Sequence, residues 1–296
     1  MAMPAFPLPL VRAMLSPYYR FTFYHRMPWR VQRALLNAVA LSQPLPAGTT
    51  RLRMTLGGRP AERITVGSAA GTGAVLYLHG GGYTVGSIGT HRSLAAHLAR
   101  AIGRPVYLLD YRLAPEHPFP AAMQDAVSAF DELAAGGGHG TGSIVLAGDS
   151  AGGGMALAAA QWLVARGTQR PAALVLLSPW ANPGLVAERR RDLVVNRSWG
   201  LACAAAYLGG GDPADPRYAP LLGKLDGLPP TYLFVGTSEL LHSQCAELAV
   251  SLRGAGVPLH YEESPTLWHA AQAQAGLVRQ AAESLQDIAR FLAPVW

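Results

Sequence analysis

Short apolar runs alternate with stretches of helical periodicity along most of this chain. Such alternation predicts an α/β fold, with a mostly parallel sheet that carries helices on both faces. Two earlier runs, at residues 51–56 and 63–66, predict antiparallel strands at one edge of the sheet. We expect the central strands to lie near Val75, Val106, Ile144, Leu174, Phe234 and Leu259.

Residues 1–45 follow a different pattern. Two amphipathic helices are predicted over residues 10–15 and 31–40, separated by an aromatic and basic stretch at residues 18–26. One interpretation of this pattern is a membrane-surface anchor built from arginine and aromatic side chains. Three prolines before residue 10 interrupt the only early apolar run, which argues against a secretory signal. No uninterrupted apolar stretch is long enough to cross a bilayer.

A serine lies at one of the predicted strand-to-helix turns. Residues 148–152 read G-D-S-A-G, after an apolar run at 143–147 and before an alanine-rich stretch that ends at Arg166. A turn of this kind lifts the serine hydroxyl above the sheet edge, and its neighbours must be small to avoid the adjacent strand and helix. A plain glycine-rich turn is the alternative. The pattern predicts Ser150 as a nucleophile.

A second glycine-rich segment follows the predicted strand at residues 74–78. Glycines let backbone N–H groups face a ligand, and acyl transfer needs such donors for the charge on the carbonyl oxygen. We expect Gly81, Gly82 and Ala151 to form this oxyanion hole, with His79 bracing the loop and Tyr83 lining the acyl pocket. A phosphate-binding loop is the alternative, but the Gly-Lys-Ser/Thr of a Walker motif is missing.

Three segments of the chain match the pattern of a known family. They are Y-L-H-G-G-G-Y at residues 77–83, D-Y-R-L-A-P-E-H-P-F-P-A-A at 110–122 and G-D-S-A-G-G at 148–153. The order of the two glycine motifs is that of lipases and esterases. From about Arg51 to its C-terminus, the chain resembles the hormone-sensitive-lipase-like family of α/β-hydrolases, the bacterial family IV carboxylesterases. The resemblance implies the α/β-hydrolase fold with a helical cap.

The fold places the catalytic acid and then the histidine after the last two strands. The loop after the strand near Leu259 contains His269, which we predict to be the base, and Trp268 is a predicted substrate contact. The six histidines in helices or surface loops, His25, His91, His97, His117, His139 and His242, are expected to be solvated. The preceding strand exits into G-T-S-E-L, so we predict Glu239 as the acid. Most family members carry aspartate there, and this chain resembles the relatives that carry glutamate.

The resemblance also suggests a division of the chain. In relatives the N-terminal helices form part of a cap over the active site. We therefore divide the chain into cap helices at residues 1–45 and a hydrolase domain at residues 46–296, with a cap insertion at about 181–210. The cap interpretation of residues 1–45 stands beside the membrane-anchor interpretation.

Composition and charge limit the kinds of partner and cofactor that we expect for this chain. The net charge of +6 comes from scattered arginines, and no zinc-finger or recognition-helix pattern accompanies it, so nucleic acid is not an expected partner. Only Cys203 and Cys245 are present, which fits a reducing compartment and a cytoplasmic location without disulfides. We expect no metal and no cofactor, because serine-dependent hydrolysis needs neither. A homodimer is left open.

The sequence thus predicts a serine carboxylesterase that hydrolyses short- to medium-chain esters through an acyl-enzyme. A lactone hydrolase with the same triad is the main alternative, because only the pocket would differ. A non-catalytic receptor on the same fold is the alternative from another class. A plant hormone receptor similar to this family lacks the catalytic histidine, whereas this chain has His269.

Overall fold

The computed structural model describes residues 6–296 except 69–70, 137–138, 140, 168 and 189–191. One eight-stranded sheet forms its centre, in the order β1-β2-β4-β3-β5-β6-β7-β8. Strand β2 pairs antiparallel with β1 and β4, and every other pair is parallel, which confirms the predicted sheet and its antiparallel edge. The strands are β1 (Thr49–Leu56), β2 (Arg59–Val66), β3 (Ala74–Leu78), β4 (Val106–Leu109), β5 (Ile144–Asp149), β6 (Ala173–Leu177), β7 (Thr231–Gly236) and β8 (Leu259–Ser264).

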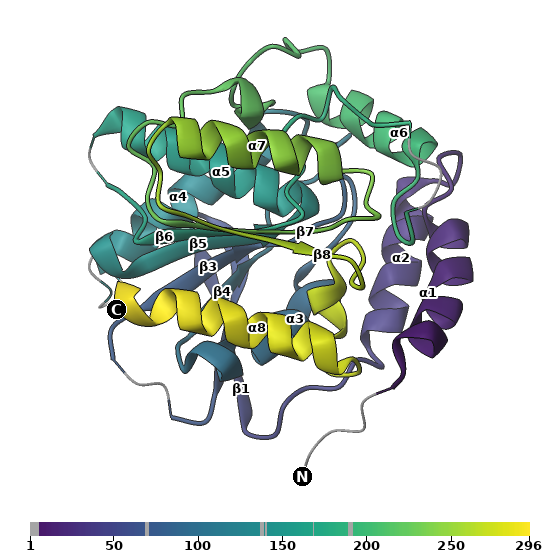
Figure 1. Cartoon of the computed structure of the whole chain (residues 1–296), viewed down its shortest axis with the longest axis horizontal. Helices are drawn as coiled ribbons and strands as arrows, with labels where there is room; N and C mark the ends of the chain where they lie inside the picture. The colour runs from purple at the N-terminus through teal and green to yellow at the C-terminus, as the bar shows by residue number, and fades with distance from the viewer. Residues whose placement is uncertain (1–5, 69–70, 137–138, 140, 168, 189–191) are drawn as a thin grey trace.

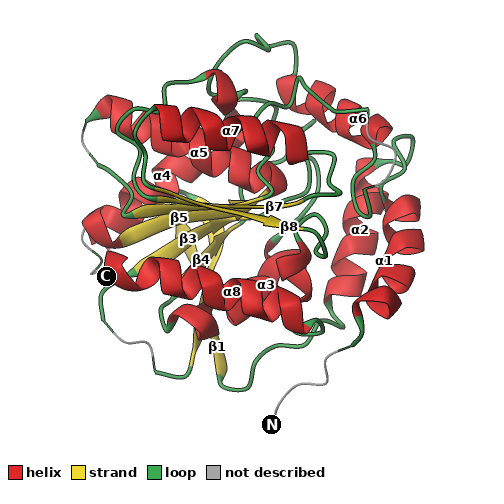
Figure 2. Cartoon of the chain, in the orientation of Figure 1, coloured by secondary structure: helices red, strands yellow, loops and turns green. Residues whose placement is uncertain are grey.

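Helices cover both faces of this sheet, as the α/β pattern predicted (Figures 1 and 2). Side chains of the buried strands alternate between two cores, because successive residues of a strand point to opposite faces. Leu76 and Leu146 enter the first core, and Val75 and Val145 enter the second. The first core is covered by α4 (Ala121–Gly136), α5 (Ser150–Arg166) and α7 (His242–Gly254), and the second by α3 (Ile88–Ile102) and α8 (Arg279–Leu292).

Three further helices lie beyond the carboxyl ends of the parallel strands (Figure 1). They are α1 (Leu8–Thr22), α2 (Trp29–Ala40) and α6 (Arg197–Leu208). The ring of Phe23, just after α1, stacks on Trp199 of α6 with centroids 4.2 Å apart. The indole N–H of Trp199 also donates to the Gln32 side chain of α2 at 2.8 Å. The N-terminal helices and α6 are therefore joined although they are distant in sequence.

Helix α1 is longer than the sequence pattern predicted. It continues to Thr22, through residues assigned to the stretch between the two helices. Its later side chains pack inward, since Tyr19 stacks on the buried Phe23 with ring centroids 5.5 Å apart. Burial of these rings outweighs their modest helix propensity. Within the described residues, no helix has both the length and the apolar character needed to span a membrane.

Candidate active site

Ser150 occupies a strained turn between β5 and α5. Its φ of +52° lies in the left-handed region, which costs a non-glycine residue about 1–3 kcal/mol. The flanking glycines make this turn possible: a Cβ on Gly152 would lie 2.0 Å from the Leu78 carbonyl oxygen, and one on Gly148 would lie 2.5 Å from the Gly152 carbonyl oxygen. The G-D-S-A-G pattern is thus a packing requirement of this turn.

The loop after β3 approaches Ser150 from the neighbouring strand. Gly81 has a φ of +120°, and a Cβ there would lie 2.3 Å from the carbonyl oxygen of Val85. The backbone N–H groups of Thr84 and Val85 both donate to the Gly81 carbonyl, at 3.1 and 2.9 Å, and close the loop. The N–H of Ala151 lies in the first turn of α5, where a helix offers its N–H groups no internal acceptor.

His79 lies beneath this loop and does not line the cavity described below. Its ring stacks on Tyr111 with centroids 4.2 Å apart, and its Nδ1–H donates to the Gly80 carbonyl at 2.9 Å. The Tyr111 hydroxyl donates to the His79 carbonyl at 2.6 Å. Burial lowers the pKa of His79 to about 3, so the ring is neutral. These contacts support a bracing role.

His269 and Glu239 meet between the ends of β7 and β8. His269 Nδ1 lies 2.8 Å from Glu239 Oε2, and both side chains are almost fully buried. The other carboxylate oxygen, Oε1, accepts from the Ser178 hydroxyl at 2.8 Å and from the Gly236 backbone N–H. A Cβ on Gly236 would lie 2.8 Å from Oε1, so this glycine admits the longer side chain of glutamate.

The carboxylate changes the protonation of the histidine. Burial by itself would lower the pKa of His269, because it disfavours the charged ring. The hydrogen bond and the charge of Glu239 act in the opposite direction and raise this pKa to about 8. The pair therefore stabilises an imidazolium although both side chains are almost fully buried.

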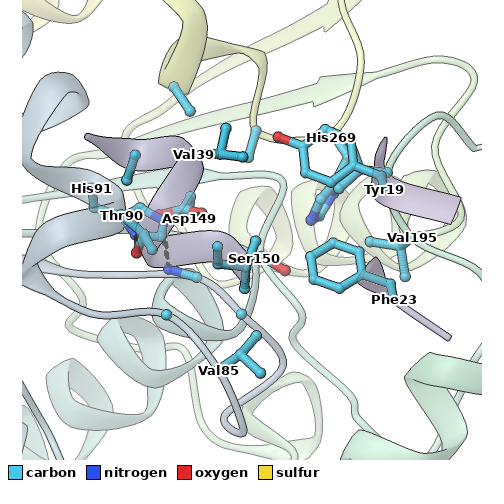
Figure 3. Close-up of a pocket in the computed structure, with 18 of the residues that line it drawn as sticks. Tyr19, Phe23, Val39, Val85, Thr90, His91, Asp149, Ser150, Val195 and His269 are labelled. Carbon is cyan, nitrogen blue, oxygen red and sulfur yellow. Dashed lines mark hydrogen bonds and ion pairs between the residues drawn. The ribbon is translucent and has the colours of Figure 1, made fainter. Parts of the chain in front are cut away.

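Ser150 and His269 line one cavity of about 110 Å³ (Figure 3). Gly81 and Val85 of the loop after β3 form part of its wall. Most of the remaining lining is apolar or aromatic and comes from α1, α2 and the approach to α6. Those side chains are Leu15, Tyr18, Tyr19, Phe23, Leu36, Val39, Ala40, Val194, Val195 and Trp199.

Two residues that were predicted to contact substrate, Tyr83 and Trp268, do not line the cavity in the structure. Tyr83 is 1% exposed and stacks flat on Tyr207, with centroids 3.7 Å apart, outside the cavity lining. Trp268 is also 1% exposed and lies in the second core, with the Arg12 guanidinium 5.8 Å from its ring. Both side chains are packing residues behind the cavity wall. Gly82 is likewise absent from the lining; a Cβ there would lie 2.7 Å from the Cys203 sulfur.

Asp149 and His91 form a polar network that the sequence did not reveal. Asp149 is 2% exposed and accepts from the Tyr77 hydroxyl at 2.9 Å and from the Gly80 backbone N–H at 3.0 Å. His91 Nε2 lies 3.4 Å from its other oxygen, and His91 lines the cavity (Figure 3). Burial raises the pKa of Asp149, but the charge of His91 and hydrogen bonds from His91 and Tyr77 outweigh it and lower the pKa.

The prediction of solvated histidines was wrong for His91 and His97. The His91 side chain is 13% exposed and His97 is 2% exposed, both on α3. Burial, with the nearby charge of Arg100, lowers the pKa of His97 to about 4. His91 is covered because it reaches Asp149 at the end of β5, whereas His97 is covered beside Pro44 and Gly276. Among the described residues, no group of three or more His, Cys, Asp or Glu side chains could hold a metal ion.

The chain is similar to several known proteins. Residues 75–273 match the model of a family with the alpha/beta hydrolase fold. An acetyl-hydrolase of Streptomyces hygroscopicus is 40% identical over 72% of this chain and 76% of its own length. An ethyl acetate hydrolase of Pseudomonas putida is 34% identical over 74% of this chain and 72% of its own length. A crystal structure of an esterase from the bacterial hormone-sensitive lipase family has a TM-score of 0.91 at 37% identity, covering 97% of both chains.

Proposed function

Because the chain belongs to the hormone-sensitive-lipase family of α/β-hydrolases and is a carboxylic ester hydrolase, we propose that Ser150, His269 and Glu239 form its catalytic triad. One observation carries this proposal. The 2.8 Å contact between His269 and the buried carboxylate of Glu239 adjoins a cavity that Ser150 lines from a strained turn. A nucleophile, a base and a group that orients the base are the parts that acyl transfer requires.

The reaction proceeds in two halves. Ser150 Oγ attacks the ester carbonyl while His269 Nε2 takes the hydroxyl proton, and the imidazolium then gives this proton to the departing alcohol. A water molecule next attacks the acyl-enzyme, again losing its proton to His269, and the carboxylic acid leaves as Ser150 regains a proton. Glu239 accepts a hydrogen bond from Nδ1–H of the ring and stabilises the imidazolium in both halves of the reaction.

The oxyanion that forms in each half needs hydrogen-bond donors that are already oriented. We assign this role to the backbone N–H groups of Gly81, Gly82 and Ala151. The glycine conformations and the closed loop at Gly81 support the assignment. Asp149 acts as a positioning residue, because it precedes Ser150 and holds the N–H of Gly80, next to Gly81.

The substrates we propose are esters with short to medium acyl chains. A cavity of about 110 Å³ lined mostly by apolar and aromatic side chains suits a short acyl chain with its alcohol. Relatives named for acetyl and ethyl acetate hydrolysis support the same size class. A panel of p-nitrophenyl esters from acetate to laurate tests this, with simple lactones assayed alongside. We expect kcat/KM to peak between acetate and hexanoate; a maximum at laurate, or on a lactone, would contradict the proposal.

Val39 offers a direct test of the cavity wall. This α2 residue is 40% exposed and lines the cavity, so Val39→Trp should fill its outer part. We expect hexanoate hydrolysis to fall about tenfold while acetate hydrolysis changes less than threefold, since one or two displaced methylenes are worth roughly 1–2 kcal/mol. Val31→Trp is the matched control, because Val31 is 39% exposed on the same helix but outside the lining. If both variants had the same chain-length profile, Val39 would not belong to the wall that the acyl chain contacts.

The pH dependence of kcat/KM follows from the His269 pKa. The free enzyme can use this ring as a base only when it is neutral, so activity should rise with pH through a limb near pH 8. Glu239→Gln removes the carboxylate that raises the pKa and leaves burial, which lowers it. The limb should therefore move to lower pH in that variant. Asp226→Asn, before β7, should leave it in place. A wild-type limb at or below pH 6.5 would contradict the assignment.

A further inference from the structure

Positive charge is concentrated at the N-terminal end of this chain. The first acidic residue is Glu62, and residues 1–61 hold eight arginines and no lysine. The whole chain has a net charge of +6, so residues 62–296 together carry a charge of −2, the difference between +6 and +8. Charge asymmetry of this size indicates an anionic partner for the basic end.

An apolar stripe accompanies this charge on the outer face of α1. Leu10, Met14 and Phe21 are 47, 67 and 64% exposed. Their spacing, with Pro17, places them within about 60° of one another around the helix. Helix α1 forms the outermost layer beside α2, as Figure 1 shows, so no described segment covers this stripe.

The arginines at positions 12–33 differ in what they contact. Arg12 stacks on Trp268, and Arg33 pairs with Glu116 while it donates to the Thr84 carbonyl. Arg20, Arg26 and Arg30 are exposed and form no ion pair with any described residue. Arg20 lies about 80° from Leu10 around the helix, which places it beside the stripe. Exposed apolar side chains next to unpaired cations are typical of a helix that lies in a lipid–water interface.

We propose that this face, made of Leu10, Met14, Phe21 and Arg20, binds an anionic lipid surface. A second copy of the chain fits it poorly, because a two-fold interface brings each patch against itself. The arginines of the two copies would then meet, and the segment before Glu62 contains no acid to pair with them. Anionic headgroups instead attract each arginine while the apolar stripe enters the headgroup boundary.

Such docking has a consequence for substrate access. The opposite side of α1 carries Leu15 and Tyr19, which line the cavity with Ser150. One helix therefore contacts lipid on its outer side and substrate on its inner side. Esters dissolved in the lipid surface would reach the cavity without first crossing bulk water. This consequence rests on the proposed function, whereas lipid binding itself does not.

Vesicle binding of the full chain tests the proposal. We expect co-sedimentation with phosphatidylcholine vesicles in which about a third of the lipid is phosphatidylglycerol, and weak binding to pure phosphatidylcholine. Binding should fall steeply between 0.1 and 1 M NaCl, where the screening length shrinks from about 10 to about 3 Å. Arg20→Gln should weaken partitioning about fivefold, and Met14→Glu about tenfold or more.

Two matched controls separate this face from the rest of the surface. Val250→Glu on α7 introduces the same charge at a residue that is 69% exposed, against 67% for Met14. Arg279→Gln on α8 removes an arginine of 73% side-chain exposure. Both should bind vesicles like wild type.

Equal loss in the controls, or equal binding to neutral vesicles, would overturn the proposal. So would a wild-type dimer that Met14→Glu converts to monomer without any vesicle binding, which would identify a second copy as the occupant. Hydrolysis of soluble p-nitrophenyl acetate should stay within twofold in Met14→Glu and Arg20→Gln, because neither residue lines the cavity. Loss of that activity with intact vesicle binding would count against the proposed function alone.

Discussion

Ser150→Ala is expected to lower kcat/KM for p-nitrophenyl acetate by about four decades or more. Removal of the nucleophile leaves only binding and oxyanion stabilisation, which accelerate reactions far less than a complete triad. The fold should survive, because alanine is no larger than serine in a turn that already requires glycine on both sides. Circular dichroism and the midpoint of thermal unfolding check this second part.

Ser284→Ala is the matched control for this variant. Ser284 is also a buried serine, 3% exposed, but it lies on α8 and bonds to Gln272 outside the cavity. It should retain activity close to wild type. If Ser150→Ala kept more than a tenth of wild-type activity while remaining folded, another residue would have to be the nucleophile.

Glu239→Gln is expected to lower kcat by about three decades, less than Ser150→Ala or His269→Ala. The local hydrogen bonds explain why. The Ser178 hydroxyl and the Gly236 N–H both donate to Oε1, so the amide oxygen of glutamine should take that position. The amide NH₂ then faces His269 Nδ1 and favours the tautomer whose proton is on Nε2. A ring protonated at Nε2 cannot accept the proton of Ser150.

Two other carboxylates provide the comparison for Glu239→Gln. Asp226 precedes β7, at the opposite end of the strand from Glu239, and Glu247 lies within α7. Asp226→Asn and Glu247→Gln should each keep at least half of wild-type kcat. Full activity in Glu239→Gln, or a larger loss in either comparison variant, would send the search for the acid elsewhere.

The central strands could be predicted from the sequence because a strand that is buried on both faces appears there as a short, continuous apolar run. Each strand from β3 to β7 is a short run of fully buried residues, and the helices between the runs indicate parallel pairing. The edge strand β1 is more polar, and the run at residues 51–56 still predicted it. The spatial order of the strands, in contrast, depends on pairings between distant residues that no local pattern contains.

The local motifs at Ser150 and Gly81 were predictable because steric limits act over a few residues. Contacts between distant segments were not. Tyr83 lies next to the glycine loop in sequence, yet it packs on Tyr207 of α6, and His91 lies on α3, yet it reaches Asp149. Tertiary packing sets which side of a helix or loop faces the cavity. It therefore places Tyr83 outside the cavity lining and brings His91 to Asp149.

The most direct test of the account is covalent labelling by an organophosphonate such as p-nitrophenyl ethylphosphonate. The Ser150 oxygen attacks the phosphorus, p-nitrophenolate leaves, and the phosphonyl group remains on the serine as a tetrahedral mimic of the acyl transition state. We predict one label per chain by intact mass, located on Ser150 by peptide sequencing. Labelling should slow markedly in His269→Ala and disappear in Ser150→Ala. A label on any other residue, or undiminished labelling of Ser150→Ala, would contradict the proposed mechanism.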